Sequence, residues 1–68
     1  MAALRRCAAE GVVRKDGSAV PWKAWFVQDS PNLLHFEVAF PGRRVTQTVM
    51  SSAHQAPMVA TRIVREAA

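Results

Sequence analysis

The feature that most constrains the fold is an eight-residue run, LLHFEVAF, in which every second side chain is apolar. Leu34, Phe36, Val38 and Phe40 alternate there with His35, Glu37 and Ala39. Successive side chains of a β-strand point to opposite faces of a sheet, so a period of two predicts a half-buried strand. The apolar face of this strand requires a second layer to cover it.

A second strand is expected directly after this run. Pro41 and Gly42 suit the second and third positions of a type II turn, where proline fixes φ and glycine accepts a positive φ. The next residues, RVTQTV, alternate again through Val45, Gln47 and Val49. We therefore predict a β-hairpin of residues 33–40 and 44–49.

An upstream hairpin is predicted by Asp16-Gly17, because both residues tolerate the positive φ of a type I′ turn. It would join residues 9–15 to residues 19–28. An alternative is a helix with Pro21 in its first position, which would place both tryptophans and Phe26 on one face. The strand is favoured because no N-cap residue precedes Pro21 and the segment is rich in valine and aromatic residues.

The C-terminal tail predicts an amphipathic helix over residues 56–67. At 100° per residue, its apolar side chains form one stripe and Thr61, Arg62, Arg65 and Glu66 lie on the other side. Ser52 and Gln55 resemble a capping box, but a helix beginning there would place Pro57 inside it and lose a hydrogen bond. A distorted first turn, or a start near Ala56, resolves this conflict.

These elements predict one small α+β domain over residues 1–68. We expect a three- to four-stranded antiparallel meander over residues 9–50, with the helix packed on one face and residues 1–8 frayed or in a short helix. A chain of 68 residues buries only about 60% of its unfolded surface. We therefore expect support from self-association or from a protein partner. One cysteine, Cys7, excludes an intramolecular disulfide, and with two histidines it does not supply four zinc ligands, so no metal and no cofactor are expected.

The two tryptophans decide which face of the sheet is free. Trp22 and Trp25 are three residues apart, so in a regular strand they point to opposite faces. Trp22 belongs with the uncharged Ala24 and Phe26 in the core, which leaves Trp25 on the open face. Two alternatives are a bulge at Pro21, or a Trp25 covered by Leu4 and Cys7 or by a second copy of the chain.

The chain is basic, with nine Lys and Arg against five Asp and Glu, a net charge of +4. Arg43 and Arg44 follow a turn and are the most exposed cations that the sequence places, either to bind phosphate or to keep the hairpin tip solvated. The candidate binding residues are Trp25, Lys23, His35, Arg43, Arg44, Arg62 and Arg65.

Catalytic chemistry is not expected. His35 and Glu37 share a face, as an acid/base pair would, but no third group follows at a telling spacing. His54 lies near Ser51 and Ser52 without a nucleophile elbow. We therefore expect surface and loop roles for both histidines.

Two functions fit these observations. The first is a non-catalytic interaction or assembly module that forms a homo-oligomer or binds a protein. The second is a nucleic-acid-binding module that uses a sheet face and arginines on hairpin turns. For the second, the expected element order is similar to that of plant AP2 domains and some phage integrase N-termini, without shared motif residues. No apolar run of about 18 residues or secretory signal is visible, so a cytoplasmic protein without membrane contact is expected.

Overall fold

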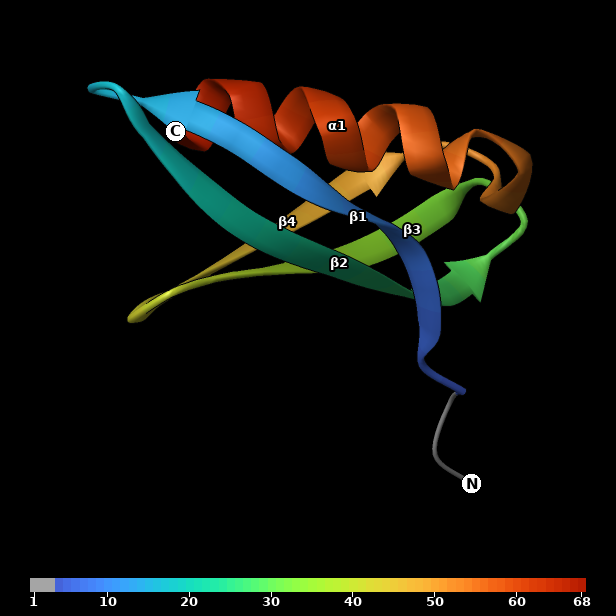
Figure 1. The fold of residues 1–68 in the computed structure, drawn as a ribbon. Helices are drawn as coiled ribbons and strands as arrows, with labels where there is room; N and C mark the ends of the chain where they lie inside the picture. Colours follow the sequence, from blue (N-terminus) through green and yellow to red (C-terminus); the bar gives the residue numbers. More distant parts are fainter. Residues whose placement is uncertain (1–3) are drawn as a thin grey trace.

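The computed structural model describes residues 4–68, which form a four-stranded sheet and a C-terminal helix. The elements in chain order are β1 (Arg6–Lys15), β2 (Ser18–Ser30), β3 (Leu33–Phe40), β4 (Arg43–Met50), a 3₁₀ turn η1 (Ala53–Gln55) and α1 (Ala56–Ala67). The sheet is an antiparallel meander with strand order β1-β2-β3-β4. The helix lies along one of its faces (Figure 1). The predicted α+β fold is confirmed.

Both predicted tight turns have the backbone that their residues suit. Asp16 and Gly17 have φ of 53° and 79°, as a type I′ turn demands. Gly42 has φ of 74°, which fits the third position of a type II turn. The strands on either side pair without a gap, Lys15 with Ser18 and Phe40 with Arg43.

Pro21 lies inside β2 without breaking the sheet. It pairs with Val12 on β1, whereas the pairing of β2 with β3 begins only at Lys23. Along β2, residues that exchange hydrogen bonds with β1 alternate with residues that do not, and counting from the turn shows that Pro21 is one of the latter. Its nitrogen therefore points away from β1, toward a position that β3 does not reach. No ladder hydrogen bond is lost there, so the strand needs no bulge at Pro21.

The first strand begins earlier than the sequence predicts. Residues 6–8, which we expected to be frayed or in a short helix, are extended and pair with β2. Arg6 lies opposite Phe26 and Cys7 opposite Trp25, and a bulge between Cys7 and Ala9 shifts the register. Pairing with a neighbouring strand here prevails over the helical propensity of alanine and arginine. Leu4 and Arg5 belong to no helix or strand, and residues 1–3 of that prediction lie outside the described residues.

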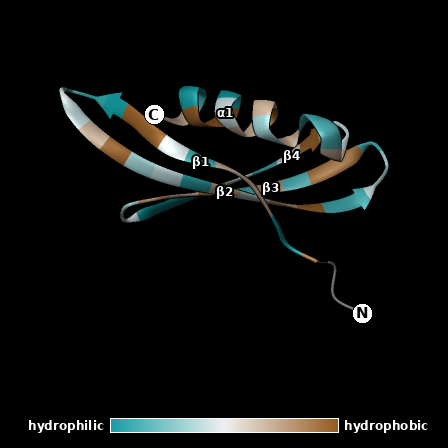
Figure 2. Cartoon of the chain, turned by 45° about the vertical axis from the view of Figure 1, so that its right-hand side comes forward, coloured by the Kyte–Doolittle hydropathy of each residue, from teal (hydrophilic) through white to brown (hydrophobic). Residues whose placement is uncertain are grey.

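The core forms between the inner face of the sheet and α1. Trp22, Ala24 and Phe26 are buried together with the predicted apolar set of β3, so the strand prediction for residues 19–28 is confirmed and the helical alternative is wrong. The buried residues are Ala8, Trp22, Ala24, Phe26, Leu34, Phe36, Val38, Ala56, Val59, Ala60, Ile63 and Val64. The hydrophilic turns of α1 face away from the sheet (Figure 2).

Both solutions expected for the start of the helix are observed, because a distorted turn precedes α1 and α1 itself begins at Ala56. The 3₁₀ turn η1 precedes α1, and Pro57 lies in the first turn of α1, where a missing N–H costs little. Ser52 makes no side-chain cap; instead the Ser51 hydroxyl donates to Gln55 Oε1 at 3.2 Å. The capping box that Ser52 and Gln55 resemble therefore does not form.

The helix covers the sheet unevenly. It packs on β1, β2 and β3. On β4 the inward-facing Val45 and Val49 stay partly exposed and Gln47 is exposed. Within residues 4–68, no helix is long and apolar enough to span a membrane.

Candidate functional site

The candidate site is the open face of the sheet, the face opposite α1. Trp25 lies near its middle, directly across from Cys7 on β1 and from Glu37 on β3. Its side chain is half-buried, in contrast to Trp22, which is 9% exposed. The two tryptophans thus point to opposite faces, as their odd spacing predicts.

Cationic side chains cover part of the Trp25 ring. The Arg5 guanidinium lies 4.1 Å from the ring centroid, and the Lys23 ammonium lies 5.4 Å from it. Both are within the range of a cation–π contact. The predicted cover by Leu4 is wrong, because Leu4 is 79% exposed. The sequence does not predict a role for Arg5, because the expected sheet begins only at residue 9, whereas β1 begins at Arg6.

Glu37 holds two arginines beside the tryptophan. Arg44 Nη1 donates to Glu37 Oε2 at 3.0 Å, and Arg5 Nη2 lies 3.3 Å from Oε1. Oε1 is enclosed and accepts no hydrogen bond, so the Arg5 contact is one of charge alone. The Glu37 carboxylate is thus held by a hydrogen bond at Oε2 and by an ion pair at Oε1.

His35 is held by partners other than Glu37. Its Nδ1 lies 2.9 Å from Thr48 Oγ1, and its Nε2 lies 3.3 Å from Asp29 Oδ2. The two side chains that could have formed an acid/base pair are thus engaged separately, His35 toward one edge of the face and Glu37 toward the tryptophan.

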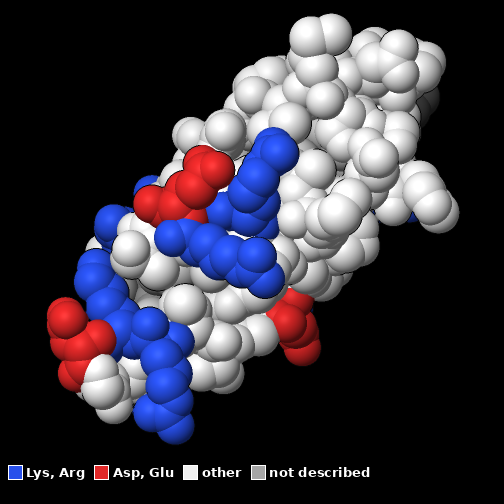
Figure 3. All heavy atoms as spheres, turned by 90° about the horizontal axis from the view of Figure 1, so that it is seen from above, with Lys and Arg blue, Asp and Glu red and all other residues white. Residues whose placement is uncertain are grey.

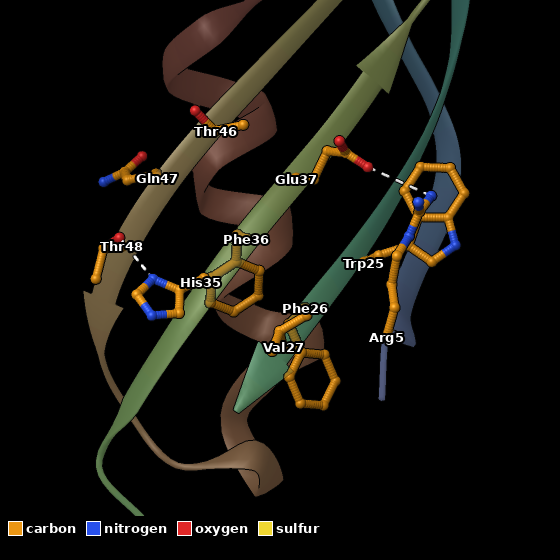
Figure 4. Close-up of a pocket in the computed structure, with 10 residues that line it drawn as sticks. All are labelled: Arg5, Trp25, Phe26, Val27, His35, Phe36, Glu37, Thr46, Gln47 and Thr48. Carbon is orange, nitrogen blue, oxygen red and sulfur yellow. Dashed lines mark hydrogen bonds and ion pairs between the residues drawn. The ribbon is translucent and has the colours of Figure 1, made fainter. Parts of the chain in front are cut away.

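A shallow hollow of about 400 Å³ lies between these groups. On the open face it is lined by Arg5, Trp25, Val27, His35, Glu37, Thr46 and Thr48. Figure 4 shows the Arg5 side chain crossing the Trp25 ring at one side of the hollow, with His35 and Thr48 at the other. The hollow is open to solvent and combines an aromatic wall with polar groups, which suits a side chain of a binding partner.

The ion-paired charges on this face are balanced, whereas Arg14, which lies on the same face across from Ala19, has no ion-pair partner among residues 4–68. All the ion pairs found within residues 4–68 lie here, joining Arg5 and Arg44 to Glu37, Lys23 to Glu10, and His35 to Asp29. Three cations and three carboxylates therefore cancel when His35 is neutral. The six other cations and two other carboxylates of the chain carry the net charge of +4.

Most of the cations outside these ion pairs lie away from the open face. Viewed from the helix side, Lys and Arg cluster over one half of the molecule with a few acidic side chains among them, and the other half is almost uncharged (Figure 3). Arg62 and Arg65 are exposed on α1 and have no ion-pair partner in the described part of the chain.

The seven predicted binding residues do not form one site. Trp25, Lys23, His35 and Arg44 share the open face. Arg43 lies on the other side of β4, where its Nη2 donates to the carbonyl of Ala67 at 2.6 Å. Arg43 and Arg44 are both exposed beside the turn, as expected, but alternation puts them on opposite faces of β4 and each has a hydrogen-bond partner.

Among residues 4–68, no group of three or more His, Cys, Asp or Glu side chains could hold a metal ion. No family model, curated protein or solved structure matches the chain. Function therefore has to be inferred from the geometry of the open face and of the helix side.

Proposed function

We propose that the chain is a non-catalytic interaction module, which associates with a second copy of itself through the open face of the sheet. The observation that supports this most is the combination on one uncovered face of a half-buried tryptophan, a hollow beside it and balanced charges. Aromatic anchors surrounded by polar groups are typical of the centres of protein interfaces.

Balanced charge suits a second copy better than a polyanion. In a two-fold dimer the same patch meets itself, so each group needs its complement within that patch. The open face has both signs, with Arg44 beside Glu37 and Lys23 beside Glu10. A cation of one copy can then lie against a carboxylate of the other.

The size of the chain also supports association. A typical interface takes about 800 Å² from each partner, which is about one sixth of the 4624 Å² that this chain exposes. Packing two open faces together would give each sheet a second layer on the face that α1 leaves uncovered. The domain would then no longer depend on a thin core alone.

A non-catalytic role is supported by the way the titratable groups are held. His35 and Glu37 have separate partners, and the exposed Cys7 has no adjacent base among the described residues. Thr48, His35 and Asp29 do join a hydroxyl, an imidazole and a carboxylate through hydrogen bonds, but these contacts are exposed to solvent, whereas the orienting carboxylate of a catalytic triad is buried. We propose in addition that the protein is located in the cytoplasm.

Nucleic-acid binding is the second candidate, and the net charge outside the open face favours it. The unpaired Arg62 and Arg65 could contact phosphates from the helix side. The open face suits this role less, because Arg5 already lies on the Trp25 ring where a base would stack.

Sedimentation equilibrium of the purified chain tests the proposal. We expect a mass of about 15 kDa, twice the 7.5 kDa of one chain, at high protein concentration. Trp25→Ala should weaken the dimer about thirtyfold, because removing an interface anchor costs about 2 kcal/mol. Met58→Ala is the matched control: Met58 is 65% exposed on α1, away from the open face, so its loss should leave the mass unchanged.

A 7.5 kDa species at every concentration would overturn the proposal of a dimer. The nucleic-acid candidate is tested by fluorescence anisotropy of labelled oligonucleotides at low and at physiological salt. Counterion release predicts binding that weakens steeply with salt and requires Arg62 and Arg65. Such binding by a monomer would replace the proposed function with the second candidate.

A further inference from the structure

Arg5 lies at the point where the chain enters the sheet. It belongs to no helix or strand, and the pairing of β1 with β2 begins only at the next residue, Arg6. Residues 4–5 extend beyond the sheet on the side away from α1 (Figure 1). The Arg5 side chain turns back from there across the Trp25 ring (Figure 4). Arg5 is therefore held on the open face by its side chain and not by strand pairing.

The contacts that hold Arg5 are exposed to solvent. Its guanidinium lies 4.1 Å from the centroid of the Trp25 ring and 3.3 Å from Glu37 Oε1, and 48% of the side chain is exposed. A cation–π contact and an ion pair of this kind each contribute little in water. Glu37 also keeps its hydrogen bond from Arg44 when Arg5 moves away. Displacing Arg5 from the ring therefore has a low cost in free energy.

Arg5 also occupies ring surface that a partner would contact. Trp25 is half-buried, and both Arg5 and Trp25 line the hollow of the open face. A side chain of a second copy can therefore contact the whole exposed part of the ring only after Arg5 has left it.

The charges of the open face favour a dimer interface without Arg5. Besides Arg5, this face has three Lys and Arg side chains and three carboxylates: Arg14, Lys23, Arg44, Glu10, Asp29 and Glu37. With Arg5 in place and His35 neutral, each copy therefore has one excess positive charge, and a dimer would enclose two. Enclosing a charge without a partner is unfavourable. Moving Arg5 into solvent leaves the covered charges balanced.

We propose that Arg5 is a displaceable cover on Trp25, which lowers the affinity of the chain for a second copy of itself. This inference rests on the proposed function. In the free chain Arg5 lies over the ring, whereas in the dimer it points into solvent and the open face of the second copy contacts Trp25. The residues before β1 thereby set the concentration at which the dimer forms.

Loss of Arg5 would have the opposite effect on nucleic acid bound at this face. Phosphate groups attract cations, so a polyanion would retain Arg5 and would bind less tightly without it. A second copy, which has the same excess of positive charge, would bind more tightly. The direction of the change therefore separates the two kinds of partner.

Sedimentation equilibrium of two variants, Arg5→Ala and Arg6→Ala, tests the proposal. Arg6 is the matched control, because it lies on the α1 side of the sheet, 5.0 Å from the Phe26 ring, and its loss changes the net charge equally. Arg5→Ala should lower the dissociation constant of the dimer at least about fivefold, since each cation–π contact contributes about two- to fivefold and each dimer displaces two. Arg6→Ala should stay within about twofold of the native value.

Quenching of tryptophan fluorescence by acrylamide measures the cover directly, at dilutions where the chain is a monomer. Trp22 is 9% exposed, so this neutral quencher reports mainly on Trp25. The Stern–Volmer constant should rise in Arg5→Ala, because the ring loses its cover, and should keep the native value in Arg6→Ala. Circular dichroism checks that both variants keep the native fold.

An Arg5→Ala dimer that is no tighter than the Arg6→Ala dimer would overturn the cover, since Arg5 would then be an ordinary part of the interface. Equal quenching of the two variants would overturn it as well. These results would leave the proposed dimer standing. If the native chain and Arg5→Ala both remain monomers at every concentration, the proposed function fails and this inference fails with it.

Discussion

At the scale of single residues, the stability of this small domain depends on a few fully enclosed side chains. Val38 is one of them, with 0% exposure between the sheet and α1. Val38→Ala should lower the free energy of unfolding by about 2–3 kcal/mol, since it removes buried methyl groups and leaves a cavity. Urea denaturation measures the change.

Val12→Ala is the matched control for this prediction. Val12 is a strand valine with 63% exposure, so the same substitution there should cost less than about 1 kcal/mol. Equal losses at the two positions would mean that Val38 is not part of the core that the structure shows.

The tryptophans show what residue-level reasoning could predict about the candidate site. Alternation along a strand is a local rule, so the burial of Trp22 and the exposure of Trp25 follow from their spacing alone. The positions of Arg5 and Arg43 do not follow from spacing. Their long side chains reach Trp25 and the Ala67 carbonyl, and such contacts depend on which strands and helices meet in the folded chain.

At the scale of elements, the turn after β3 should be sensitive to its glycine. Gly42 has φ of 74°, and nothing lies close to the position where a Cβ would be added, so the cost of a side chain there is one of backbone strain. Gly42→Ala should therefore lower stability by about 1–2 kcal/mol. Gly42→Asn should cost less, because asparagine tolerates this conformation better. Thermal unfolding compares the two, and an equal loss would contradict the strain argument.

Most elements could be predicted because their signals are local. The alternation of β3, the two turn dipeptides and the amphipathic pattern of α1 each lie within a dozen residues, and the predicted helix has the observed bounds, Ala56–Ala67. The start of β1 could not be predicted in this way. Residues 6–8 have no alternating pattern, and they are extended because they pair with β2 about 20 residues later in the chain, through a bulge that shifts the register.

The position of α1 across the sheet could not be predicted from the sequence either. The apolar stripe shows which side of the helix is buried, but not which strands it covers. The helix packs on β1, β2 and β3, and this choice leaves the inner face of β4 beside an open groove. The groove is thus a product of tertiary packing, and no motif marks it.

At the scale of the whole molecule, the separation of charge makes a prediction about salt. The ion pairs of the open face are balanced, and of the six Lys and Arg side chains outside those pairs only Arg14 lies on that face. The dimer should therefore respond weakly to ionic strength, changing less than about threefold in dissociation constant between low and physiological salt. Sedimentation at two salt concentrations measures this, and a change of a hundredfold would mean that charges rather than Trp25 hold the copies together.

The most direct test of the account is the accessibility of Cys7. This residue is the one cysteine of the chain, it is exposed, and it lies directly across from Trp25 on the open face. Its rate of alkylation by iodoacetamide under reducing conditions can be followed by mass spectrometry on the native protein, from dilute solution to concentrations at which the dimer forms. If the open face is the interface, the rate should fall at least about tenfold as the dimer forms, because the thiol becomes covered. A rate that stays constant while the mass doubles would place the interface elsewhere and contradict the proposed role of the open face.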